Sequence, residues 1–227
     1  MIGNRIEEVC SNIERCAHLA GRDPGSITLV AVTKTKPVHM IREAYDAGLK
    51  CFGENRVQEY LEKKDELPAD VKWNLIGRLQ TNKVKYIINN IWMLHSLDRL
   101  SLAEEIQKQC EKSDCTLNAL LQVNVAGEDT KTGFSPEEVM GAAETIAKMK
   151  RIKILGLMTI APYTDDKDVL RKIFAKTKRL YDKIADEKFE GFDFKVLSMG
   201  MTNDYCEAVK EGANMLRIGS AIFGDRG

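Results

Sequence analysis

The sequence predicts a single (β/α)8 TIM barrel that occupies residues 1–227 as one domain. Eight extended segments alternate strictly with helical segments, and no linker rich in proline, glycine or serine divides the chain. The length of 227 residues lies within the range of about 200–250 that such barrels commonly use. The alternative, an open doubly wound sheet, is disfavoured because no GxGxxG motif follows the first strand.

An extra helix is expected before the first strand. Apolar residues recur at steps of three and four from Ile2 to Ala20, which is typical of an amphipathic helix, and Gly21 ends the pattern. This helix can cover the barrel wall where the eighth strand lacks a full helix after it. The segment ITLVAVT, residues 27–33, is a continuous apolar and β-branched run, which indicates a parallel strand covered on both faces.

The later elements follow from turn and capping signals. Pro37 suits the first turn of a helix and Gly48 its end. Residues 135–138, Ser-Pro-Glu-Glu, form a capping box with proline at the first helical position, so a helix is expected to begin there. The other expected strands are 50–53, 72–76, 91–96, 117–125, 152–160, 194–198 and 214–218, and the helices between them are 38–47, 55–66, 82–90, 98–111, 136–149, 166–186 and 203–211.

Composition and charge exclude several classes of protein. The 34 Lys and Arg residues balance 34 Asp and Glu residues at a pI near 6.8, so no long-range field would attract the phosphate backbone of a nucleic acid. No apolar run approaches the roughly 18 residues that span a bilayer, and acidic residues interrupt the N-terminus where a signal peptide would be apolar. We therefore expect a soluble, cytoplasmic protein that contacts neither nucleic acid nor membrane.

The cysteines and histidines do not indicate a metal site. The six cysteines include no CxxC pair, and none of the three histidines has metal-ligand spacing to a cysteine or to another histidine. Because no secretion signal is present, we expect the thiols to be reduced.

Two glycine and hydroxyl stretches suggest a phosphate site. Functional groups of such barrels lie at the C-terminal ends of the strands, and phosphate sites favour the loops after strands seven and eight. In the stretches 198–203 and 217–220, the backbone at Gly200 and Gly219 can approach an anion, and hydroxyl groups can donate further hydrogen bonds. The hydroxyl residues are Ser198, Thr202 and Ser220. The alternative is that Thr202 only caps the following helix and that the glycines merely form turns.

Strand alternation directs Arg217 into the barrel. It shares a strand face with Met215 and Gly219, so its guanidinium can point into the barrel mouth. The alternative is a structural ion pair, with Glu54 as a candidate partner.

Lys34 is a candidate for covalent chemistry at the end of the first strand. Burial and a nearby cation such as Arg217 would depress the pKa of a lysine and supply a free amine that attacks an aldehyde. Lys36 has the same strand parity, but it precedes Pro37 and belongs to the loop, which favours Lys34. The alternative is a lysine that extends to the solvated rim.

Six motifs occur in order along nearly the whole chain. Together they resemble the YggS/PROSC family of pyridoxal phosphate homeostasis proteins. The motifs are AVTKTKP, FGENRVQE, WNLIGRLQTNK, GLMTI, LSMGMTND and RIGSAIFG.

The resemblance implies a barrel like the N-terminal domain of alanine racemase, which is fold type III among proteins that use pyridoxal 5′-phosphate (PLP). It implies a Schiff base between PLP and Lys34, with Asn55 near the ring hydroxyl and Arg217 near the pyridine nitrogen. It also implies contacts around the phosphate and the ring. The phosphate contacts would be Ser198, Gly200, Thr202, Gly219 and Ser220, and the ring contacts would be Met158 and Met199.

The chain departs from the family pattern at two places. Many members have histidine at the position of Asn74, which puts a proton-relay role there in doubt. The ending FGDRG lacks an aromatic residue and tail that often follow the last glycine, which would leave the pocket more open.

The resemblance implies a carrier rather than an enzyme. PLP-dependent racemases of this type need a second acid or base, commonly a tyrosine from an additional β domain, and no residues remain after the eighth strand for such a domain. We therefore expect a monomeric protein of intracellular PLP homeostasis, with PLP-dependent apoenzymes as transient recipients. Two alternatives remain, a PLP-dependent amino-acid racemase and a cofactor-free barrel enzyme that acts on phosphosugars.

Overall fold

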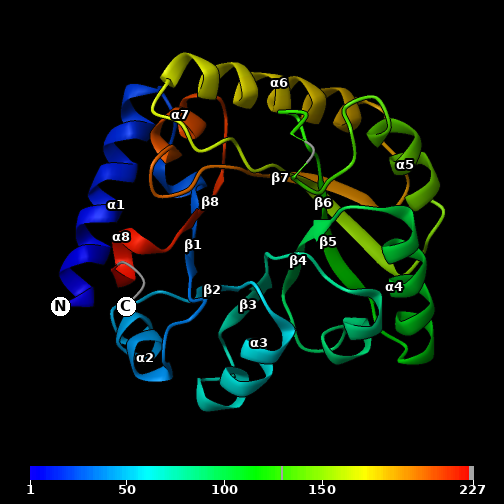
Figure 1. The fold of residues 1–227 in the computed structure, drawn as a ribbon, viewed down its shortest axis with the longest axis horizontal. Helices are drawn as coiled ribbons and strands as arrows, with labels where there is room; N and C mark the ends of the chain where they lie inside the picture. The colour runs from blue at the N-terminus through cyan, green and yellow to red at the C-terminus, as the bar shows by residue number, and fades with distance from the viewer. Residues whose placement is uncertain (129, 225–227) are drawn as a thin grey trace.

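The computed structural model describes residues 1–128 and 130–224. Eight parallel strands pair in chain order, and the first strand also pairs with the eighth, so the sheet closes into a barrel (Figure 1). This arrangement confirms the predicted fold class. The strands are β1 (Thr28–Val32), β2 (Cys51–Glu54), β3 (Lys72–Leu75), β4 (Met93–Leu97), β5 (Leu117–Gln122), β6 (Ile152–Met158), β7 (Phe192–Ser198) and β8 (Met215–Ile218).

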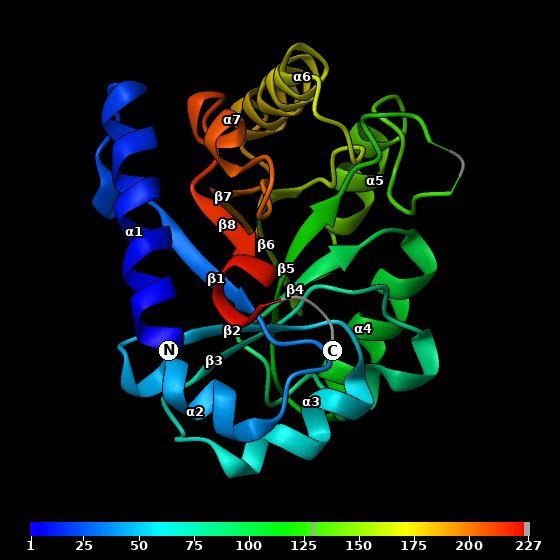
Figure 2. The same cartoon turned by 60° about the vertical axis from the view of Figure 1, so that its left-hand side comes forward.

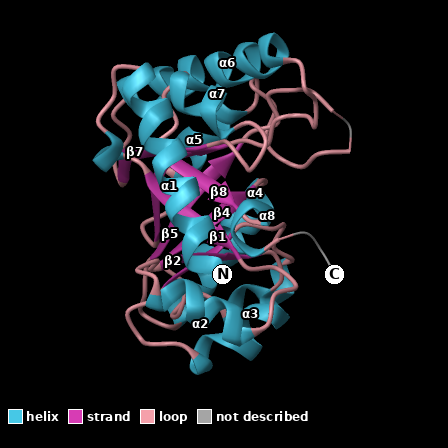
Figure 3. Ribbon diagram, turned by 90° about the vertical axis from the view of Figure 1, so that its left-hand side faces the viewer, coloured by secondary structure: helices cyan, strands magenta, loops and turns pink. Residues whose placement is uncertain are grey.

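Helices surround the barrel (Figure 3). The α-helices are α1 (Ile2–Leu19), α2 (Val38–Asp46), α3 (Val57–Lys63), α4 (Leu100–Lys112), α5 (Val139–Ile146), α6 (Lys167–Asp186), α7 (Tyr205–Lys210) and α8 (Ser220–Phe223). Three 3-10 helices join them, η1 (Pro24–Ser26), η2 (Lys64–Glu66) and η3 (Thr81–Tyr86). Among the helices of the described residues, none combines the length and the apolar character that a membrane crossing needs.

The predicted N-terminal helix is present as α1. Its apolar stripe is buried from Ile2 to Cys16, and the helix runs along the outside of the barrel against α7 and α8 (Figure 2). The helix α8 after the last strand is short and was not predicted. Together α1 and α8 cover the wall beside β1 and β8.

Three connections differ from the prediction. The helix expected over 82–90 is only the 3-10 helix η3. The fifth strand ends at Gln122 because the chain then turns, with the Asn124 amide donating to two backbone carbonyls of the loop. The capping box at Ser135 forms both of its hydrogen bonds with Glu138, yet the α-helix proper begins only at residue 139 and ends at 146.

The expectation that all thiols are reduced is wrong for one pair. Cys16 of α1 and Cys206 of α7 form a disulfide across 190 residues of sequence. The packing of α1 against α7 brings their Cα atoms to 5.4 Å, which lies within the range that a disulfide bridges. Sequence spacing does not reveal this contact, because it depends on how two distant helices meet. The free cysteines are Cys10, Cys51, Cys110 and Cys115.

A test of the barrel wall concerns Gly156 in β6. The strand pairing shifts its register near this residue, which has φ 151°, and an added Cβ would lie 1.7 Å from the carbonyl oxygen of Val196 in β7. We expect Gly156→Ala to separate the two strands and to lower the free energy of unfolding by about 3 kcal/mol or more, measured by urea denaturation.

Gly141 in α5 provides the control for that measurement. An added Cβ there meets nothing within 4 Å, and alanine favours a helix by about 1 kcal/mol over glycine, so Gly141→Ala should not destabilise the protein. Equal stability of the two variants would contradict the proposed constraint between β6 and β7.

Candidate functional site

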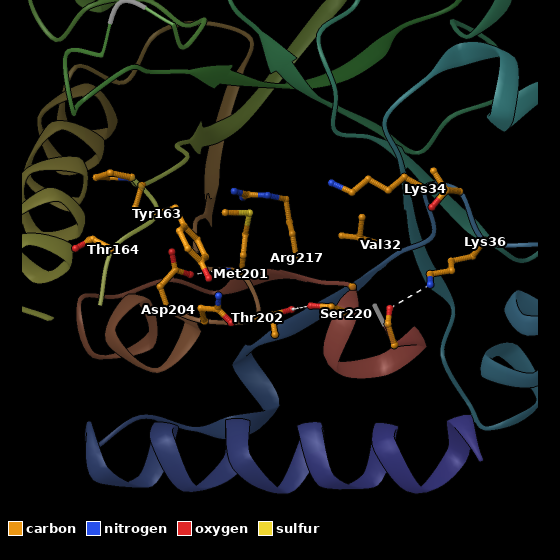
Figure 4. Close-up of a pocket in the computed structure, with 16 residues that line it drawn as sticks. Val32, Lys34, Lys36, Tyr163, Thr164, Met201, Thr202, Asp204, Arg217 and Ser220 are labelled. Atoms are coloured by element: carbon orange, nitrogen blue, oxygen red, sulfur yellow. Dashed lines mark hydrogen bonds between the residues drawn. The ribbon is translucent and has the colours of Figure 1, made fainter. Parts of the chain in front are cut away.

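A cavity of about 460 Å³ opens at the C-terminal end of the barrel (Figure 4). The loops after β1, β6, β7 and β8 form its lining. Five of the residues expected to contact PLP lie in this lining, together with Lys36, and the structure therefore brings together parts of the chain that are far apart in sequence. The five residues are Lys34, Thr202, Arg217, Gly219 and Ser220.

Lys34 extends into the cavity because it continues the inward-facing positions of β1. Val30 of this strand belongs to the cluster inside the barrel, and Val32 lines the cavity. Figure 4 shows the Lys34 side chain extending toward the Arg217 side chain. The structure thus places an amine opposite a guanidinium.

The turn that carries Lys34 is held from outside the barrel wall. Lys63 of α3 donates to the backbone oxygen of Thr33 at 3.0 Å and pairs with the Glu54 carboxylate at 2.7 Å. The Thr33 hydroxyl donates to the same carboxylate oxygen at 2.6 Å, and the N–H of Thr35 donates to Glu59 at 2.7 Å. The residues on both sides of Lys34 are therefore fixed, and Thr35 is held at φ 62°.

The alternative partner for Arg217 is ruled out by this arrangement. Glu54 shares strand parity with Phe52, whose side chain lies in the core between barrel and helices, so its carboxylate faces α3 rather than the barrel interior. Burial raises the pKa of Glu54, and the hydrogen bonds that it accepts from Lys63 and Thr33 act to lower that pKa. Sequence analysis did not single out Lys63, and no spacing signal connects it to Lys34.

Lys36, the competitor of Lys34, has a separate contact. Its Nζ donates to the backbone oxygen of Gly224 at 3.1 Å, next to the end of the described chain (Figure 4). This contact directs Lys36 away from Arg217. Residues 225–227, which complete the atypical FGDRG ending, lie outside the described residues.

Arg217 lies on the cavity floor and is only 4% exposed. Its Nη1 donates to the Ser198 hydroxyl at 2.6 Å and its Nη2 to the backbone oxygen of Thr159 at 2.8 Å. Burial lowers the pKa of the guanidinium to about 10, with the Asp204 charge acting in the opposite direction. Arg217 is therefore still a cation at neutral pH, and it is held by neutral acceptors.

Asn74 fixes the direction of the hydrogen bonds behind Ser198. Its amide nitrogen donates to the backbone oxygens of Phe52 and Lys72, at 3.1 and 3.0 Å. Its Oδ1 can only accept, so Nε2 of His95, at 3.0 Å, carries the proton. The bare Nδ1 of the neutral His95 ring then accepts from the Ser198 hydroxyl at 3.2 Å.

This chain of hydrogen bonds includes Ser198, which the sequence predicts as a phosphate contact. The Ser198 side chain is buried below Arg217, accepts from the guanidinium and donates to His95, and it does not line the cavity. His95 is not predicted as a site residue, because it has no metal-ligand spacing to another histidine or cysteine. The available signal was a histidine within the apolar strand IWMLHSL.

The loops after β7 and β8 meet at the rim of the cavity. The Ser220 hydroxyl donates to the Thr202 hydroxyl at 3.2 Å. Thr202 is not a helix cap, because α7 begins at Tyr205 and Asp204 occupies the N-cap position. The Asp204 carboxylate accepts a hydrogen bond from the N–H of Met201. The alternative role for Thr202 is thereby excluded.

The two glycines of this rim have different surroundings. An added Cβ at Gly219 would lie 3.2 Å from Cβ of Val32, so this residue lets the loop approach β1. Gly200 has φ 96° and packs against Ala208, and it does not line the cavity.

The remaining expected residues lie away from the cavity lining. Met158 is buried in the cluster inside the barrel, and Met199 is buried in the core between the barrel and the helices. Asn55 lines a second cavity, and its Oδ1 is buried without a hydrogen-bond partner among the described residues.

The hydrogen-bond chain predicts the state of His95. Burial and the charge of Arg217 hold the pKa of the imidazole well below its ordinary value, so we expect a neutral ring protonated on Nε2. In ¹⁵N-labelled protein, the ring nitrogen shifts of His95 should show this tautomer and stay constant between about pH 5 and 8. A proton on Nδ1, or ring nitrogen shifts of His95 that change over this pH range, would contradict the assigned chain.

Comparison with known proteins identifies relatives over nearly the whole chain. The family model of the alanine racemase N-terminal domain matches residues 6–227. A protein of Aquifex aeolicus named pyridoxal phosphate homeostasis protein is 43% identical over 223 residues, which cover 98% of this chain and 97% of that protein.

Solved structures agree with this similarity. PipY of Synechococcus elongatus PCC7942, in a structure with PLP bound, is 32% identical with a TM-score of 0.84, and the match covers 99% of this chain and 100% of PipY. Alanine racemase of Clostridium difficile shares the fold alone, at 16% identity and a TM-score of 0.77, over 98% of this chain and 57% of the racemase. The chain therefore belongs to the family of pyridoxal phosphate homeostasis proteins, which are built on the alanine racemase N-terminal domain.

Proposed function

We propose that this chain binds PLP as a Schiff base on Lys34 and acts in intracellular PLP homeostasis. The placement of Lys34 opposite the buried Arg217 cation, in one cavity, is the observation that carries the proposal. The names of the relatives and the PLP bound to PipY support it. We further propose that residues 1–227 form one cytoplasmic, monomeric domain.

The residues around the cavity fit the groups that PLP carries. Lys34 Nζ can attack the aldehyde carbon, so that a C=N bond forms and the aldehyde oxygen leaves as water. The hydroxyl pair of Thr202 and Ser220, with the close approach at Gly219, suits the phosphate. The unpartnered Oδ1 of Asn55 suits the ring hydroxyl, although this residue lines the second cavity.

Arg217 favours binding over catalysis. PLP supplies a pyridine ring that withdraws electrons most strongly when its nitrogen is protonated. A guanidinium offers only hydrogen-bond donors, and Arg217 is held as a cation by Ser198 and Thr159, so it can donate to that nitrogen but leaves it unprotonated. We therefore propose a carrier without efficient turnover that releases PLP to apoenzymes.

The racemase alternative would need a second acid or base opposite Lys34. Tyr163 is the one tyrosine in the cavity lining of the described chain, and its side chain is 91% exposed. No hydrogen bond of the described residues holds the Tyr163 hydroxyl in place. A group that is neither buried nor oriented is poorly suited to transfer a proton.

The lysine assignment is tested with a matched pair of variants. Lys34→Ala should abolish both the visible absorbance band of bound PLP and the adduct trapped by borohydride, because no amine then reaches the aldehyde. Lys36→Ala should retain both signals, since Lys36 bonds to Gly224 instead. The reverse result would transfer the role to Lys36. A wild-type protein that forms no adduct would instead favour the cofactor-free phosphosugar enzyme.

The carrier assignment is tested by proton exchange. The PLP-loaded protein is incubated with L-alanine in deuterium oxide, and NMR and chiral analysis follow the α-position. We expect exchange no faster than with free PLP, because correctly placed acid and base groups contribute about 10²–10⁴-fold each and Tyr163, the proposed second group, is exposed. Racemisation at about one turnover per second or more that is lost in Tyr163→Phe would show that the protein is a racemase rather than a carrier.

A further inference from the structure

A second cavity, of about 700 Å³, opens at the same end of the barrel. It is formed by the residues that follow β2, β3 and β4, and its lining holds four cationic side chains and no carboxylate. Because the net charge of the chain is zero, this excess of positive charge is a local property of the cavity. The cations are Arg56, Arg78, Lys83 and Arg99.

Two of these arginines are positioned by one buried carboxylate. The Asp98 side chain is 2% exposed, accepts from Nη1 of Arg99, and lies 3.4 Å from Nε of Arg78. Nη2 of Arg99 also donates to the backbone oxygen of Leu79 at 2.9 Å. These contacts use two of the five N–H donors of Arg99 and one of Arg78. The remaining donors are available to a ligand, and the charge of the cluster remains positive.

The other lining residues exclude an apolar ligand. Only Val57 and Leu79 are apolar, and the rest carry amide or hydroxyl groups that can complete the hydrogen bonds of a polar molecule. The volume falls within the range of about 300–1,000 Å³ typical of small-molecule sites. The polar residues are Asn55, Gln58, Gln80, Thr81 and Asn82.

We propose that this cavity binds a small anion that carries a phosphate group. A phosphate brings close to two charges and three strong acceptor oxygens, whereas a carboxylate brings one charge and two oxygens. The charge of four cations with one carboxylate behind them matches a phosphate better than a carboxylate. The site is separate from the Lys34 cavity, because the two linings share no residue.

The probe for this site is inorganic pyrophosphate, titrated by isothermal calorimetry. The protein is first saturated with PLP and reduced with borohydride, so that the first cavity is filled covalently. We expect one saturable binding event that weakens with added salt, because the exposed cations contribute through screened interactions. Malonate, a dicarboxylate of similar size, should bind more weakly.

Lys83 and Lys85 provide a matched pair of variants on η3. Both amines lie near the Tyr86 ring, at 5.7 and 5.0 Å from its centroid, but only Lys83 lines the cavity. Removing an exposed charge costs about 1 kcal/mol at most, so the double variant Arg78→Gln, Lys83→Gln should weaken pyrophosphate about tenfold. Lys85→Gln should change the affinity by less than about twofold.

Three outcomes would overturn the phosphate site. They are the absence of saturable pyrophosphate binding in the wild-type protein, an equal loss in Lys85→Gln and in the double variant, and malonate binding as tight as that of pyrophosphate. Failure to form the reduced PLP adduct would count against the proposed function instead. In that case the same titration with Lys34→Ala protein still tests the second cavity.

Discussion

The buried cation of Arg217 is the group around which the barrel mouth is organised. A guanidinium out of water needs acceptors, and here they are a hydroxyl and a backbone carbonyl rather than a carboxylate. The hydroxyl belongs to Ser198, and it is itself fixed by His95 and Asn74. The cation is thus stabilised without being neutralised, which leaves its charge effective toward the cavity.

Strand alternation explains why this polar group of residues forms a layer. On β4, β7 and β8, an apolar residue inside the barrel is followed two positions later by a polar one, because every second residue points inward. The apolar layer closes the lower barrel, and the polar layer becomes the floor of the cavity. The pairs are Met93 with His95, Val196 with Ser198, and Met215 with Arg217. Lys34 extends the same pattern on β1, one further step toward the mouth.

The sequence is sufficient to predict which way the side chains of a strand point. It is not sufficient to predict which residues of other strands they contact. Continuous apolar runs located eight strands, and parity correctly directed Arg217 inward. Parity alone cannot identify which polar residue from another strand meets it, so Glu54 was considered although it pairs with Lys63 on the outer wall. The disulfide between Cys16 and Cys206 was missed for a related reason, because its two helices lie at opposite ends of the chain.

The zero net charge and the cationic cavities are compatible because they act over different distances. A balanced total leaves no field beyond about 8–10 Å at physiological salt, so extended phosphate backbones are not attracted from solution. Within a cavity, the nearby cations interact with a ligand at contact range, where burial reduces the screening. Lys34 and Arg217 in one cavity and the four cations of the other are placed at this range. The proposed preference for small phosphate-bearing molecules over nucleic acids therefore rests on where the charges are placed rather than on their sum.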